Sequence, residues 1–139
     1  MPTTTPPDAP ALRVARVAVR PTRVVCDLEL SAAAPALTSP ELLERVRRDF
    51  PDIDGHACVN DRGRTFGAVA DHTSVAHLFE HLVIDLQARP PAPADAVFCG
   101  TTVVHPDGRG ARVEVGFADD LAALGAVRDA CAYLNRLLA

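Results

Sequence analysis

The chain has 139 residues, of which 48% are hydrophobic and 23% are charged, and it carries a formal net charge of −4. That length and apolar content suit one globular domain, and the acidic balance excludes proteins that bind nucleic acid through a strongly basic surface. No apolar run reaches the roughly 20 residues that a membrane-spanning helix needs, so neither nucleic acid nor membrane is an expected partner. The sequence does not predict the oligomeric state.

Residues 1–10 contain four prolines and are expected to form a disordered lead ahead of a single domain over residues 11–139. They lack the basic start and apolar core of a secretion signal, which predicts a cytoplasmic protein. Four cysteines without a C-x-x-C pair agree with a reducing compartment. Cys26, Cys99 and Cys131 lie within apolar patterns and are expected to be buried, because free cysteine is among the most buried residue types.

The first elements predicted are two strands, over residues 12–20 and 24–30, where β-branched residues alternate with polar ones. A helix follows them, because Ser39 suits the N-cap position and Pro40 suits the first turn. This helix is expected to end at Pro51, since proline cannot continue it.

Residues 51–71 are rich in Gly, Asp and Asn and are predicted to be a polar loop, with a short extended piece over residues 65–69. A polar loop of this length in a small domain is typical of a functional segment. A second helix is predicted from Thr73, with an apolar stripe at helical spacing. It ends at the proline-rich link around Pro90.

The last third of the chain is predicted to form a hairpin and a helix. The hairpin strands, over residues 96–105 and 111–117, flank a turn that contains glycine. The final helix begins at Asp119 and has Leu121 on its apolar face. The order β-β-α-loop-α-β-β-α predicts an α+β domain with about three helices packed on a mostly antiparallel sheet.

The segment His77-Leu78-Phe79-Glu80-His81 lies in the second predicted helix and carries the clearest chemistry. Successive helical residues turn by about 100°, so His77 and His81 lie one turn apart and can both point at one metal ion. Glu80 shares that face. The H-x-x-E-H spacing is that of the inverted zinc peptidases, in which two histidines hold zinc and the carboxylate takes a proton from water. The alternative is a pair of solvated or structural histidines.

Catalytic zinc typically takes three protein ligands, so a third is expected from outside the helix. Cys58 is the preferred candidate, because a thiolate suits zinc and a polar stretch offers no packing reason for a cysteine. The other candidates for a ligand or a substrate contact are His56, His72, Asp85 and Glu114. Asp85 is better suited to supporting a ligand, and His72 to capping the helix or contacting substrate.

At these residues the chain resembles the N-terminal domain of cyanophycin synthetases, which build a polymer of aspartate and arginine. The resemblance covers most of the chain and is most specific over residues 72–87, which contain the H-x-x-E-H motif. The segments that extend it are residues 24–30, 50–58, 98–101 and 134–138. It implies a metallopeptidase module that, in some members, cleaves the polymer into shorter primers.

Carried over by position, the resemblance implies His77 and His81 as ligands and Glu80 as the base, and it supports His56 or Cys58 near the metal. The ligase domains of the family are absent from these 139 residues. A stand-alone homologue that cannot polymerise amino acids is therefore expected.

The preferred hypothesis is a zinc-dependent hydrolase of a peptide, isopeptide or other amide bond, with about one zinc per chain and Glu80 as general base. One alternative is a non-catalytic module that binds a metal, a peptide or a separate ligase. A weaker alternative is a metal-dependent transferase or cyclase acting on a small peptide, because the same site can support that chemistry.

Overall fold

A computed structural model describes residues 9–139 and contains three α-helices and six strands within that range. The elements in chain order are β1 (Leu12–Val19), β2 (Arg23–Leu30), α1 (Pro40–Asp49), β3 (Ala57–Asn60), β4 (Gly63–Thr65), α2 (Val75–Ala88), β5 (Gly100–Val104), β6 (Gly110–Gly116) and α3 (Asp120–Leu137). Short 3-10 turns lie between α1 and α2, at Ile53–Gly55 (η1), Phe66–Ala68 (η2) and Ala70–His72 (η3). The predicted α+β class is confirmed.

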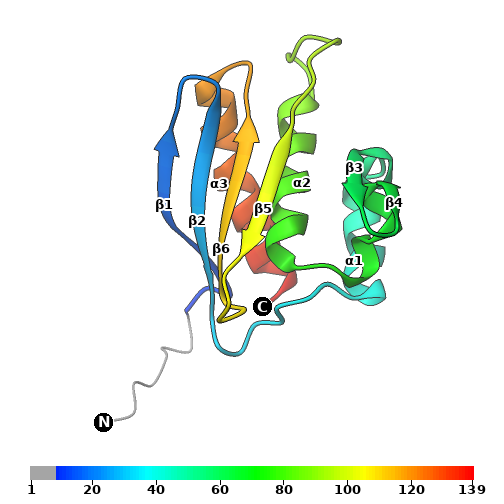
Figure 1. The fold of residues 1–139 in the computed structure, drawn as a ribbon, viewed down its shortest axis with the longest axis vertical. Helices are drawn as coiled ribbons and strands as arrows, with labels where there is room; N and C mark the ends of the chain where they lie inside the picture. The colour runs from blue at the N-terminus through cyan, green and yellow to red at the C-terminus, as the bar shows by residue number, and fades with distance from the viewer. Residues whose placement is uncertain (1–8) are drawn as a thin grey trace.

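Four of the strands form one antiparallel sheet in the order β1-β2-β6-β5, built from two hairpins that meet at the β2–β6 pair. Helices α2 and α3 cover one face of this sheet (Figure 1). Because side chains alternate between the two faces of a strand, every second residue reaches the helices. The buried sheet residues on that face include Val24, Cys26, Leu28, Val113 and Val115.

Helix α1 and the small β3–β4 hairpin form a separate lobe beside α2 (Figure 1). The lobe has its own apolar anchors, since Phe50, Ile53 and Phe66 are buried. The η1 and η2 turns hold the hairpin in place, with the Phe66 N–H donating to the His56 carbonyl at 2.9 Å. The lobe thereby brings β3 close to one side of α2.

The start of α2 is held by a short chain of hydrogen bonds. The Ser74 hydroxyl is the N-cap and accepts the His77 N–H at 3.0 Å. The Thr73 N–H donates to the Thr38 hydroxyl at 2.9 Å, and that hydroxyl donates to the Ala70 carbonyl at 2.7 Å. Because Thr38 is buried, these bonds fix the rotation of the first turn of α2, and with it the direction of His77.

Three expectations about local structure are wrong. Residues 65–69 do not form an extended piece, since only Thr65 lies in a strand, at the end of β4, and η2 occupies most of the others. Cys99 is exposed, because the two-residue alternation along β5 turns it to the face of the sheet away from α2. Leu121 is 74% exposed, because it lies roughly 200° around α3 from the buried Ala123.

The remaining cysteine expectations agree better with the structure, since Cys26 is fully buried and Cys131 is half-buried. The disordered lead expected over residues 1–10 lies almost wholly outside the described residues. Within residues 9–139, no helix combines the length and the apolar character needed to cross a bilayer.

Candidate metal centre

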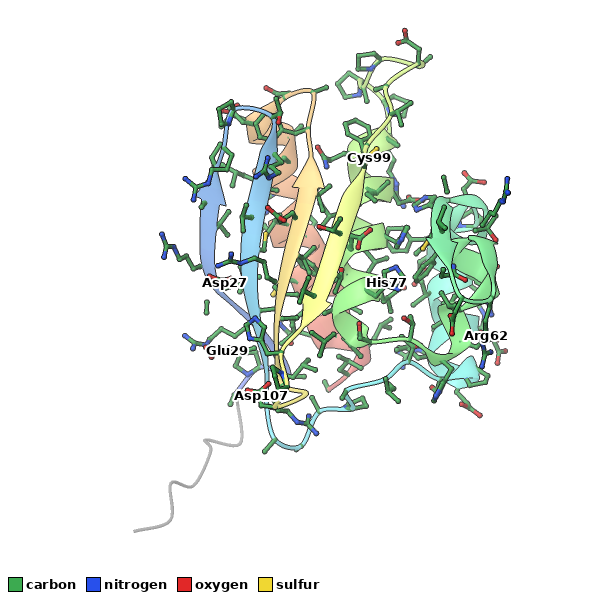
Figure 2. All side chains as sticks on the ribbon, in the orientation of Figure 1. Asp27, Glu29, Arg62, His77, Cys99 and Asp107 are labelled. Carbon is green, nitrogen blue, oxygen red and sulfur yellow. The ribbon has the colours of Figure 1, made fainter. Side chains whose placement is uncertain are left out.

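Helix α2 directs the two histidines of the H-x-x-E-H motif toward the lobe and Glu80 toward β5. His77 is half-buried, whereas Glu80 and His81 are almost completely buried, at 4% and 1% exposure. Figure 2 shows His77 between the sheet and the lobe. The two imidazole rings are 5.0 Å apart, as expected for residues one helical turn apart. The ring of Phe66 stacks on that of His81, with 4.2 Å between centroids.

Cys58 reaches the histidine pair from β3. Its Sγ lies 3.5 Å from His77 Nε2. One donor atom from each of Cys58, His77 and His81 can be chosen so that all three lie within 4.8 Å of one another. The Asn60 amide lies 3.6 Å from the Cys58 sulfur and donates to the Cys58 carbonyl at 3.1 Å, which holds the sulfur in this position.

Behind His81, a chain of hydrogen bonds determines which ring nitrogen carries the proton. The Asp85 carboxylate lies 3.2 Å from His56 Nε2, and His56 Nδ1 lies 3.1 Å from His81 Nδ1. A carboxylate can only accept, so a neutral His56 carries its proton on Nε2, and its Nδ1 accepts from the Nδ1–H of His81. His81 Nε2 is then left with a lone pair and no proton.

A similar contact lies behind His77. Its Nδ1 is 2.9 Å from the Thr73 hydroxyl, which can accept the Nδ1–H and leave the Nε2 lone pair directed at Cys58. Hydrogen bonds of this kind, from the far ring nitrogen to a neighbouring acceptor, orient the histidines of metal sites.

The His81 Nε2 atom is buried and has no hydrogen-bond partner among the described residues, although Glu80 Oε2 lies only 3.4 Å away. A nitrogen lone pair facing a carboxylate oxygen at that distance is unfavourable unless a cation or a proton lies between them. Two imidazole nitrogens and one thiol sulfur are the donor set that zinc prefers. The residues present therefore fit a zinc ion.

Burial keeps both histidines neutral. Loss of hydration lowers the pKa of His77, and it lowers the pKa of His81 to about 3, with smaller contributions from the nearby His77 and His56. Neutral imidazoles retain the lone pairs that metal binding requires, so the site needs no deprotonation of its histidines at pH 7.

Glu80 is held from the sheet side by β5. The Thr102 hydroxyl donates to Glu80 Oε1 at 2.7 Å, and Oε2 remains directed toward His81. Gly100 leaves room for this carboxylate, because a Cβ atom at that position would lie 2.8 Å from Glu80 Cγ. Burial raises the pKa of Glu80, partly offset by the Thr102 hydrogen bond and by His56. A carboxylate destabilised in this way is a better proton acceptor than an exposed one.

A cleft of about 640 Å³ opens beside these residues. Its lining includes His77, Glu80 and His81 from α2, Cys58 from β3, and residues of β5 such as Thr102. The Glu80 carboxylate and the metal candidates thus share one concave surface, as in most enzyme active sites.

The other residues singled out in the sequence are distributed differently. His56 and Asp85 lie behind His81 and support it, whereas His72 is exposed within η3. Glu114 is not near the cluster, because its carboxylate pairs with Arg23 at 2.9 Å on the uncovered face of the sheet. Its candidacy as a ligand was therefore wrong.

Sequence reasoning did not find three residues that support the site. Thr73, Gly100 and Thr102 become recognisable only once the start of α2 and the register of β5 place them against the motif. Thr73 lies four residues before His77, a spacing that in retrospect puts it one turn away. The other two come from a strand distant in the chain.

Fold and site together define an α+β domain with an H-x-x-E-H helix and a candidate nitrogen and sulfur metal centre beside a cleft. The chain belongs to the family of cyanophycin synthase-like N-terminal domains, whose model matches residues 23–139. That family is associated with a ligase system. A search of curated proteins found no match to the chain.

Proposed function

We propose that the protein is a zinc-dependent hydrolase of a peptide, isopeptide or other amide bond. The observation that carries this proposal is the buried His81 Nε2, which lacks a hydrogen-bond partner among the described residues and lies 3.4 Å from Glu80 Oε2. A cation at this position would be bound by His81, His77 and Cys58, with a carboxylate already beside it. This arrangement suits hydrolysis better than a purely structural metal site, which is normally closed by four protein ligands.

In this proposal His77, His81 and Cys58 hold the metal, and Asp85 and His56 fix the tautomer of His81. When bound, zinc supplies Lewis acidity, which polarises an amide carbonyl and makes water a stronger acid. Glu80 takes the proton of the attacking water and can pass it to the leaving amine. The raised pKa that burial gives Glu80 favours both transfers at neutral pH.

Replacing Glu80 by glutamine tests the catalytic step, because the amide keeps the size of the side chain but cannot accept the proton. We expect zinc content and fold to persist, while hydrolysis falls by roughly 10² to 10⁴, the usual contribution of general acid–base catalysis. Short aspartate–arginine isopeptides are the first substrates to try because of the family, and ordinary peptides are the second.

The matched control is Glu114→Gln, which makes the same chemical change on the uncovered face of the sheet. It should leave hydrolysis unchanged. Loss of zinc from Glu80→Gln would instead make Glu80 a ligand and contradict the role proposed for it.

The second candidate function is a non-catalytic module that binds a peptide or a separate ligase. The association of the family with a ligase system favours it. Under this alternative a proton on Glu80 satisfies His81 Nε2 in place of a metal. Purified protein that holds no zinc and hydrolyses no amide, but binds such a ligase, would support the module over the hydrolase.

A further inference from the structure

We propose that the free edge of β5 binds the substrate as an additional extended strand, and that the substrate is an α-linked peptide with uncharged side chains. The added strand would bring one of its peptide carbonyls beside the Glu80, His77 and His81 cluster. This inference rests on the proposed hydrolase function and names the substrate class of the same cleft.

Hydrogen bonding along β5 shows which of its backbone groups are free. On either side of β5, the Cys99 carbonyl accepts from the Gly116 N–H at 2.8 Å, and the His105 N–H donates to the Gly110 carbonyl at 2.8 Å, so the backbone groups of the odd-numbered residues face β6. In an antiparallel pair the residues between them direct both N–H and C=O to the opposite edge. Those residues are Gly100, Thr102 and Val104.

That opposite edge has no partner strand among residues 9–139, because β5 is the last strand in the order β1-β2-β6-β5. Natural sheets usually protect such an edge with a charged residue, a proline or a bulge. The β5 sequence, Gly-Thr-Thr-Val-Val, contains neither charge nor proline, and it pairs with β6 in unbroken register. An unprotected edge of this kind is the feature that peptide ligands use when they add a strand.

The same edge adjoins the catalytic candidates. Thr102 donates its side-chain hydroxyl to Glu80, while its backbone groups point to the free edge. Residues 99–102 and Val104 line the cleft, and Cys58 lines it from β3. Figure 1 shows β5 on the side of the sheet nearest the lobe, with α2 beside it. A strand added to β5 would therefore lie in the cleft, alongside the histidine pair.

The charges of the cleft indicate which side chains it accepts. The residues that line the cleft include one arginine, Arg64, and no lysine, and Glu80 is their one carboxylate. Val59 and Val97, at 91% and 83% exposure, add apolar surface to the lining. To a polymer with an arginine on every unit, the cleft lining offers one carboxylate, and Glu80 already accepts from Thr102. Uncharged side chains suit this surface better.

The test is peptide binding to zinc-loaded Glu80→Gln protein, which should bind without turnover. The probe is a heptapeptide, acetylated and amidated at its ends, with a glutamine at each end and five central residues that alternate between valine and threonine. Its binding is measured by titration calorimetry. A single N-methyl group is placed at each backbone amide in turn. Since an added strand engages only every second amide, affinity should fall about tenfold at alternate positions and less than twofold between them.

Val104→Pro is a complementary variant, because it removes one N–H of the free edge and leaves the bonds to β6 intact. Its affinity for the probe should fall about tenfold, with zinc content unchanged, and Val104→Ala is the matched control that keeps the N–H. An aspartate–arginine isopeptide should bind at least tenfold more weakly than the neutral probe.

Absence of binding, or equal sensitivity to methylation at every position, would overturn the proposal. Cleavage of the probe by wild-type protein without the alternating pattern would also overturn it, while leaving the hydrolase intact. Alternating sensitivity in a protein that cleaves no amide would support the added strand and reject the hydrolase.

Discussion

Replacing Gly100 by alanine should damage catalysis without removing the metal. A Cβ atom at this position would lie 2.8 Å from Glu80 Cγ and 2.9 Å from Glu80 Oε2, and 3.0 Å from the Glu114 carbonyl oxygen. Ordinary carbon contacts are at about 3.5 to 4.0 Å, so the Glu80 side chain must move by about 1 Å. The backbone oxygen cannot yield as easily as the side chain.

The size of the effect follows from that displacement. A misplacement of about 1 Å in a catalytic group can cost roughly 10²-fold in rate. Overpacking at a well-filled site typically destabilises a protein by about 1 to 3 kcal/mol. The three atoms nearest to the new methyl group belong to Glu80 and Glu114 and not to the metal candidates on α2 and β3, so zinc content should remain at the wild-type level.

The assay combines the zinc content, the urea midpoint and kcat/KM of the variant with the best amide substrate found for the wild type. Gly125→Ala is the matched control, because a Cβ atom there meets nothing closer than 4.0 Å and alanine favours the helix. Wild-type kcat/KM in a folded, zinc-loaded Gly100→Ala protein would refute the placement of Glu80 beneath β5.

Three further predictions concern the metal centre and its surroundings. Cys58 should resist alkylation until the metal is chelated, whereas the exposed Cys99 should react in both conditions; equal labelling of Cys58 in both would reject its ligation. Asp85→Asn should weaken zinc binding by about 10- to 100-fold in a competitive chelator titration, because it disturbs the hydrogen bonds that run from Asp85 through His56 to His81. Unchanged affinity would show that these hydrogen bonds do not contribute to zinc binding. Metal-free protein should lose stability as pH falls, because the unfolded chain protonates His81 at its ordinary pKa of about 6.5 while the folded chain resists protonation until about 3. The test uses a Glu80→Gln background, which removes the opposing effect of that carboxyl. The free energy of unfolding from urea titrations should drop between pH 7 and pH 5 by up to about 1.4 kcal/mol per pH unit for this histidine, and a flat profile would contradict its burial.

The local parts of the site were predictable from the sequence, because they depend on helical geometry alone. The spacing of His77, Glu80 and His81 determines that they share a face wherever the helix packs. Cys58 was found by chemistry, as a thiol in a polar stretch, and the structure places its sulfur 3.5 Å from His77. The two hairpins and the caps at Ser39 and Asp119 also follow from short-range signals.

The remaining features depend on tertiary register, which a single sequence does not encode locally. Thr102 meets Glu80 because β5 pairs with β6 in one particular register; a shift of one residue would turn the hydroxyl to the other face. The same alternation places Glu114 on the uncovered face and exposes Cys99. His56 reaches His81 only because the η1 and η2 turns fold the lobe against α2.

The central claim is that His77, His81 and Cys58 hold a metal ion, and elemental analysis of protein purified without a histidine tag tests it most directly. We expect about one zinc per chain in the wild type and none in His77→Ala or His81→Ala. The exposed His72 serves as the control, since His72→Ala should retain the metal. Stoichiometric zinc in both of the first two variants, or wild-type protein that binds none when zinc is supplied in excess, would contradict the claim.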